Sequence, residues 1–232
     1  MTIKVFITAT DTCAGKTWVT AGAVRSLLAA GKHALAVKPV ACGLDAAGRN
    51  EDIEALLAVQ NLHDADLISL YRLALPAAPL LAATAEGVQI NPGQLLSWCE
   101  NQTADVCLIE GVGGLMVPLS DGWLVSDWLA AMPDCELWLV VGCRLGAINH
   151  ALLSLDKLKA MGRMPDRIIL NAACRGDENR LQPTAQAIAS FLPADCLLHT
   201  LKHGDAFNPL LENTNSLSDA RDKGSFRSPA NR

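Results

Sequence analysis

The sequence predicts an α/β fold in three layers, with a mostly parallel β-sheet in the middle and helices on both faces. Strand-like apolar runs alternate along the chain with helical patterns, an order typical of successive βα units. Several of these runs are almost unbroken in apolar residues, as expected for strands that are buried on both faces. Hydrophobic residues make up 50% of the 232 residues, which is enough for the core of such a sheet.

The strands are predicted from apolar runs and from the residues that end them. The first run is rich in β-branched residues, which favour strands, and the second is ended by Pro39. In chain order, the predicted strands are Ile3 to Thr8, Ala34 to Lys38, Val106 to Glu110, Leu137 to Val141, Arg167 to Asn171 and Cys196 to Leu201.

Helices are predicted between these strands from apolar periodicity and from end signals. Gly31 closes the first helix, in a position that glycine often takes after a helix C-terminus. Pro92 suits the first turn of another helix. In chain order, the predicted helices are Thr17 to Ala30, Glu51 to Gln60, Pro92 to Gln102, His150 to Met161 and Thr184 to Leu192.

The pattern predicts a single domain over residues 1–212, since no linker or internal repeat interrupts it. Residues 213–232 (NTNSLSDARDKGSFRSPANR) are polar and lack periodicity. Such a composition cannot bury enough apolar surface to offset the cost of ordering. We therefore expect residues 213–232 to form a poorly ordered tail.

Composition narrows the class of protein. The formal net charge is −5, whereas a nucleic-acid-binding protein usually carries a basic face. No apolar run reaches the length of about 18 residues that a membrane span needs, and the N-terminus does not resemble a secretory signal. The eight cysteines form no C-x-x-C pair and suit buried thiols in a reducing compartment. We therefore expect a cytoplasmic protein that binds neither nucleic acid nor membrane.

The strongest local motif is the segment ATDTCAGKT, which follows the first strand and opens the first helix. Backbone N–H groups and the helix dipole favour an anion at such a helix start. Gly15 would allow a phosphate to approach, Lys16 would contact its oxygens, and the Thr17 hydroxyl would ligate Mg²⁺. Thr10 stands where the usual G-x-x-x-x-G-K-[ST] pattern has glycine, and an ordinary β–α turn is the alternative. The placement favours a nucleotide-binding loop and hence a P-loop NTPase-like fold.

Three further charged residues are candidates for the same site. Lys38 ends the second strand, where side chains of parallel sheets point into the ligand crevice; together with Lys16 it would form an anion site. Glu110 ends a buried strand and needs a partner there, so it resembles the acidic metal ligand of P-loop enzymes. For Asp52, a favourable charge at a helix N-terminus is an equal or better interpretation than a role in this site.

A second helix start follows the strand that ends near Val141. Gly146, Ala147, Ile148 and Asn149 lie there and could bind an anion such as a substrate carboxylate through backbone amides. The alternative is that Asn149 only caps the helix.

Taken in order, these motifs resemble those of the dethiobiotin synthetase family. They are T-D-T-x-x-G-K-T, K-P-V-A-x-G, E-G-x-G-G and L-G-x-I-N-H, within about residues 3–175. The resemblance implies a ligase of biotin biosynthesis that uses Mg²⁺ and ATP. In this family CO₂ adds to 7,8-diaminononanoate as a carbamate, ATP converts the carbamate to a carbamic–phosphoric anhydride, and the ureido ring closes with release of ADP and phosphate.

The resemblance also implies roles for individual residues and a homodimer. Lys16 and Lys38 would be catalytic, and Asn171 would read the adenine edge. The nucleotide would contact Thr12, Cys13, Ala14, Gly15, Lys16, Thr17, Glu110 and Asn171. Mg²⁺ would be held by Thr17, Asp52 and Glu110. The substrate would contact Lys38 and Cys42, the loop from Tyr71 to Pro79, and, from the partner subunit, Gly146, Ala147, Ile148 and Asn149.

Two other functions remain open from the sequence. A ParA/MinD-like switch ATPase would share the deviant loop, but such a protein would carry a second lysine in that loop, where this chain has Asp11 and Thr12. The second alternative is a degenerate paralogue that binds substrate or nucleotide without turnover. Cys13 stands where many family members have an acid, and Cys42 where a hydroxyl often helps to hold the carbamate. A thiol is the poorer hydrogen-bond donor.

Overall fold

The computed structural model describes residues 2–209, and the tail expected at 213–232 lies outside them. Its centre is a six-stranded sheet in which every pair of neighbours is parallel. In spatial order the strands are β10 (Leu197–Leu201), β9 (Arg167–Asn171), β8 (Glu136–Gly142), β1 (Ile3–Ala9), β5 (Val106–Glu110) and β2 (Ala34–Val37).

Seven α-helices and two small sheets complete the described part of the chain. The helices are α1 (Lys16–Ala29), α2 (Glu51–Gln60), α3 (Pro79–Ala85), α4 (Pro92–Glu100), α5 (Val125–Ala130), α6 (Ala147–Ala160) and α7 (Glu178–Ala189), with a 3₁₀ turn, η1, at Ala65–Leu67. A parallel pair joins β3 (Val40–Cys42) to β4 (Tyr71–Leu73), and an antiparallel pair joins β6 (Pro118–Ser120) to β7 (Trp123–Leu124).

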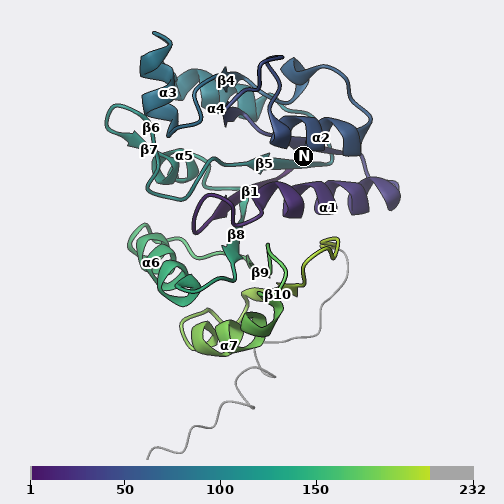
Figure 1. Ribbon diagram of the computed structural model, residues 1–232, viewed down its shortest axis with the longest axis vertical. Coiled ribbons are helices and arrows are strands. Elements are labelled where there is room, and N and C mark those ends of the chain that lie inside the picture. Colours follow the sequence, from purple (N-terminus) through teal and green to yellow (C-terminus); the bar gives the residue numbers. More distant parts are fainter. Residues whose placement is uncertain (1, 210–232) are drawn as a thin grey trace, which may run out of the picture.

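Strand register shows which residues face which layer. Ile7 of β1 is aligned with Trp138 of β8, so both side chains point to one face. On that face the Trp138 ring packs edge-on against Phe207, whose backbone lies against α1. Phe6 points to the opposite face, where it packs edge-on against Trp128 of α5. Because crossovers between parallel strands are right-handed, α6 and α7 share the face of α5 (Figure 1).

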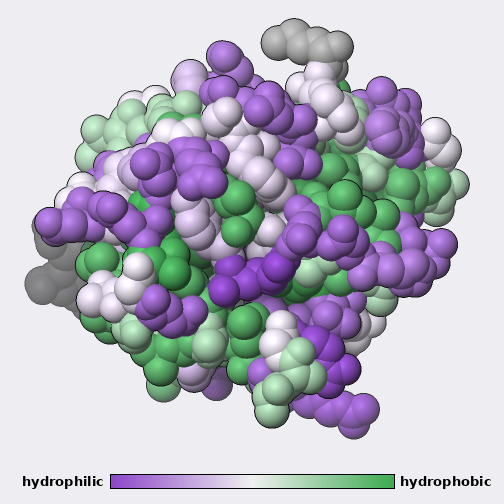
Figure 2. Space-filling view, turned by 90° about the horizontal axis from the view of Figure 1, so that it is seen from above, coloured by the Kyte–Doolittle hydropathy of each residue, from purple (hydrophilic) through white to green (hydrophobic). Residues whose placement is uncertain are grey.

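The outer surface is mixed in character. Seen from above, hydrophilic side chains surround smaller hydrophobic patches on the end of the molecule that carries α2, α3 and α4 (Figure 2). None of the helices in residues 2–209 is long and apolar enough to span a membrane.

The structure confirms the predicted fold class and every predicted strand and helix, with shifts at their ends. The helix predicted over Thr184 to Leu192 was placed wrongly at its start, because it begins at Glu178 and carries Pro183 in its interior. Proline there removes the N–H that would donate to the Asn179 carbonyl oxygen, and Asn179 is an exposed residue. The helix predicted from His150 begins at Ala147, after Gly146 in a left-handed conformation.

Candidate active site

The predicted phosphate loop joins β1 to α1, as the sequence indicates. Gly15 is the residue before the helix and has φ 92°, a conformation that favours glycine. A Cβ at this position would overlap the side-chain amide of Asn171. That amide nitrogen donates a hydrogen bond to the Ala14 carbonyl oxygen at 2.9 Å. Cys13 also has a positive φ, of 60°. The loop therefore has a defined backbone shape, held from below by the end of β9.

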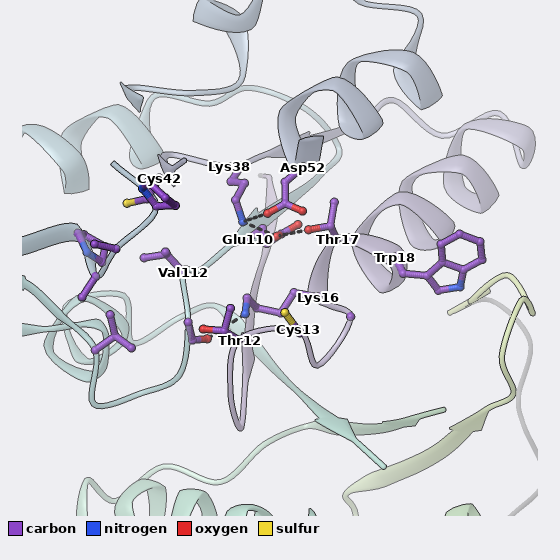
Figure 3. Close-up of a pocket in the computed structure, with 17 residues that line it drawn as sticks. Thr12, Cys13, Lys16, Thr17, Trp18, Lys38, Cys42, Asp52, Glu110 and Val112 are labelled. Carbon is purple, nitrogen blue, oxygen red and sulfur yellow. Dashed lines mark hydrogen bonds and ion pairs between the residues drawn. The ribbon is translucent and has the colours of Figure 1, made fainter. Parts of the chain in front are cut away.

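Four predicted residues meet beside this loop in a hydrogen-bonded cluster (Figure 3). The Lys38 ammonium lies 2.6 Å from Oε1 of Glu110 and 3.0 Å from Oδ2 of Asp52. The Thr17 hydroxyl donates to the same Glu110 oxygen at 2.7 Å. Glu110 is fully buried and Lys38 nearly so. The strand-end acid thus has the partner that its burial requires.

Sheet topology brings this cluster together from distant parts of the sequence. β5 lies between β1 and β2, and parallel strands end at the same edge of a sheet. Glu110 at the end of β5 therefore lies between the loop that follows β1 and Lys38, which follows β2. Asn50 sets the position of Asp52, because its side-chain oxygen accepts from the Asp52 backbone N–H while its amide nitrogen donates to the Cys42 carbonyl oxygen.

The two lysines are in different electrostatic environments. Burial, and then the positive charge of Lys38, lower the pKa of Lys16 to about 8. Its ammonium donates to the Gly113 carbonyl oxygen at 2.9 Å and makes no ion pair with a carboxylate in the part of the chain that the structure describes. Burial also opposes the charge of Lys38, but the carboxylates of Glu110 and Asp52 outweigh this and raise its pKa. Lys38 therefore stays cationic, and Lys16 is a desolvated cation beside the loop.

The acidic residues keep capacity for a further cation. Burial alone would raise the pKa of Asp52, but Lys38 and the Thr17 hydroxyl outweigh it and lower that pKa. The second oxygen of Glu110, Oε2, is buried without a hydrogen-bond partner. A buried acceptor left unpaired is costly. Glu110, Asp52 and Thr17 are oxygen donors of the kind that Mg²⁺ prefers, so the residues present fit that ion. Among residues 2–209, no three His, Cys, Asp or Glu side chains are grouped so that they could hold a metal ion. The donors here are two carboxylates and one hydroxyl.

A cavity of about 680 Å³ lies over the cluster and the loop. Besides the predicted site residues, it is lined by the segment Pro76 to Pro79, part of the loop predicted to cover the substrate. Cys42 faces the same space, and burial raises the pKa of its thiol to about 11. Four further residues that line the cavity were not among the predicted site residues: Trp18, Val112, Gly113 and Val117. The glycine-rich run after Glu110 was the signal for Val112 and Gly113.

The remaining predicted site residues lie elsewhere. Gly146 to Asn149 do not line this cavity. They form the start of α6, directly after Leu145, which is 86% exposed. Nearby, Arg144 forms an ion pair with Asp11 of the phosphate loop. Asn171 lies under the loop. Within one chain, therefore, the helix-start segment and the lysine cluster are separate.

Comparison with known proteins gives matches over most of the chain. The profile of a family described as an AAA domain matches residues 4–199. An ATP-dependent dethiobiotin synthetase from Aromatoleum aromaticum is 40% identical over 184 residues, which cover 75% of this chain and 81% of that enzyme.

One solved structure of low sequence identity adds a similarity of fold alone. The chloroplast FtsY of Physcomitrella patens has a TM-score of 0.50 at 16% identity, and the match covers 95% of this chain but only 65% of that one. A ParA family ATPase from Chlorobium tepidum has a TM-score of 0.49 at 15% identity, over 88% of this chain and 85% of that one. An identity of 40% with the Aromatoleum enzyme carries much more: the chain belongs to the family of ATP-dependent dethiobiotin synthetases, which are ligases, and its domain to the wider AAA family.

Proposed function

We propose that this protein converts 7,8-diaminononanoate, CO₂ and ATP into dethiobiotin, ADP and phosphate. One amine of the substrate attacks CO₂ and loses a proton to give a carbamate. A carbamate oxygen takes the γ-phosphoryl group as ADP leaves, which forms a carbamic–phosphoric anhydride. The second amine then attacks the anhydride carbon, phosphate leaves, and the ureido ring is closed. The observation that carries this proposal is the pairing of Lys38 with Glu110 and Asp52 beside the phosphate loop.

The reaction brings a carbamate against a triphosphate, so the site must hold two anions close together. Lys16 and the N–H groups at the start of α1 would contact phosphate oxygens. Lys38 is fixed as a cation in the same cavity and would pair with the carbamate and the γ-phosphate. Most of the catalysis would then come from positioning and from charge stabilisation.

Mg²⁺ would be held by Thr17, Asp52 and Glu110, with the unpaired Oε2 of Glu110 as the atom that most needs a cation. When bound, the ion supplies positive charge at the phosphate oxygens. Asn171 would read the nucleobase: its amide nitrogen is used on the Ala14 carbonyl oxygen, which leaves its amide oxygen to accept from an exocyclic amine.

The diamine would lie between Cys42 and the Pro76 to Pro79 segment, which line the cavity with Lys38. Its carboxylate would reach Gly146, Ala147, Ile148 and Asn149 of a second subunit in a homodimer. Exposed apolar side chains around this segment support such a contact. They are Met116 at 58%, Leu145 at 86%, Ile148 at 40% and Leu153 at 61% exposure. Analytical ultracentrifugation should give the mass of two chains.

The direct test is product formation. Purified protein is incubated with the diamine, bicarbonate and Mg·ATP, and dethiobiotin is measured by mass spectrometry. We expect product from the wild-type protein and none from Lys38→Met or Lys16→Ala, each checked for folding by circular dichroism. A folded wild-type protein that yields no product would contradict the proposed function, and full activity of Lys38→Met would contradict the role of that residue.

A further inference from the structure

Trp18 occupies an unusual place for a large apolar side chain. It follows the phosphate loop directly, in the first turn of α1, and it is 52% exposed. Trp18 lines the cavity over the cluster, and it also lines a second cavity of about 690 Å³ along α1 and α2. In Figure 3 its indole points away from the lysine cluster, toward the C-terminal part of the described chain.

The indole is fixed rather than free in solvent. Its Nε1–H donates to the Asp205 carbonyl oxygen at 2.7 Å. Asp205 lies in the segment after β10, and this segment also meets the one after β9, since Nδ1 of His203 is 3.1 Å from the Ala173 carbonyl oxygen. β9 ends in Asn171, whose side chain supports the loop. The ends of β9 and β10 and the first turn of α1 thus meet beside the phosphate loop.

We infer that Trp18 positions the nucleoside part of the bound nucleotide. This inference rests on the proposed function only in that the loop takes the triphosphate of ATP. A triphosphate held by the backbone of residues 12–17 must continue into its ribose and base beside the start of α1, where Trp18 is the exposed aromatic side chain. An aromatic face packs against ribose and base. Because the Asp205 hydrogen bond already orders the indole, little rotamer freedom is lost when the nucleotide binds.

Trp18 should affect binding of the nucleoside but not binding of the phosphates, and calorimetry can measure these two contributions separately. Binding of Mg·ATP and of Mg·tripolyphosphate, which has no nucleoside, is compared in the wild type, Trp18→Ala and Trp18→Phe. Phe191→Ala is the matched control, because Phe191 is a similarly exposed aromatic residue (57%) that lines neither cavity.

We expect Trp18→Ala to weaken ATP binding about ten-fold or more, with tripolyphosphate binding unchanged. Trp18→Phe keeps an aromatic face and should lose less, and Phe191→Ala should bind like the wild type. Equal losses for both ligands would overturn the inference, because Trp18 would then act only on the loop. Unchanged ATP binding in Trp18→Ala would overturn it as well.

A fluorescence measurement covers the case in which Trp18→Ala does not fold. The chain has five tryptophans, so ATP-induced emission changes are compared between the wild type and Trp18→Phe. The inference predicts a change that is lost in Trp18→Phe, and a change of equal size in both would overturn it. A wild-type protein that binds neither ligand would instead contradict the proposed function, because the loop itself would then fail.

Discussion

Replacing Lys38 with methionine should leave a buried carboxylate without its cation. In the wild type, the ammonium of Lys38 lies 2.6 Å from Oε1 of Glu110, and the two side chains are 5% and 0% exposed. Methionine keeps most of the apolar stem and removes the charge. Because Glu110 is fully buried, hydration replaces little of its lost interaction with Lys38.

The size of the effect follows from these contacts. Removing one partner of a buried ion pair costs about 3–5 kcal/mol. Thr17 still donates to Glu110, so the lower end, about 3 kcal/mol, is expected for Lys38→Met. Glu110→Gln should cost less, about 1–2 kcal/mol, because Lys38 retains Asp52 at 3.0 Å. The double variant has no unpaired buried charge and should cost less than the sum, by roughly 1–3 kcal/mol.

Urea unfolding followed by circular dichroism at pH 7, without nucleotide, measures all three variants against the wild type. Non-additivity of the size given above supports a true buried pair. If the costs of the two single variants add within about 0.5 kcal/mol, then Lys38 and Glu110 do not interact in solution and the reasoning fails. Enzyme activity should be absent in both variants that lack Lys38.

Three more predictions concern the loop and the thiols. Gly15→Ala should weaken Mg·ATP binding about ten-fold in calorimetry, since a positive φ and an overlap with Asn171 strain the loop; wild-type affinity would count against the loop geometry. Burial and the charge of Lys38 lower the pKa of Lys16 to about 8, so its charge is lost as pH rises through that value. ATP affinity should therefore fall between pH 7 and pH 9, and it should not in Lys16→Arg; a wild-type affinity that is the same at both values refutes this. Iodoacetamide should label exposed Cys13 before Cys42, whose pKa burial raises to about 11, and Mg·ATP should slow labelling of Cys13; equal rates in peptide mass spectrometry would contradict this order.

The sequence allowed the sheet, and most of the residues that meet in the candidate site, to be predicted, because these signals are local. Buried parallel strands are marked by apolar runs, and the loop by its place between a strand and a helix. Glu110 and Lys38 were each predicted as strand-end residues. Their pairing could not be predicted from spacing alone, because it depends on β5 lying between β1 and β2, which is not the order of the strands in the sequence.

The elements that were missed are short or depend on tertiary contacts. α3 and α5 have seven and six residues, too few for a helical period to stand out. β3 and β4 pair with each other at Val40–Cys42 and Tyr71–Leu73, far apart in sequence and without a hairpin turn. Asn50 was not predicted as a helix cap, although an asparagine directly before Glu51 is typical of one. Its second role, on the Cys42 carbonyl oxygen, depends on the folded chain.

In the proposed reaction, this site transfers a phosphoryl group to a carbamate rather than to water. The most direct measurement follows oxygen from C¹⁸O₂ in a rapid reaction with the diamine and Mg·ATP. A carbamate oxygen that attacks the γ-phosphorus leaves with the phosphate when the ring closes. We therefore predict one ¹⁸O atom in each phosphate released, detected by mass spectrometry, with dethiobiotin formed in equal amount. Phosphate without ¹⁸O would show that water attacks ATP; it would contradict the proposed reaction and indicate a plain ATPase.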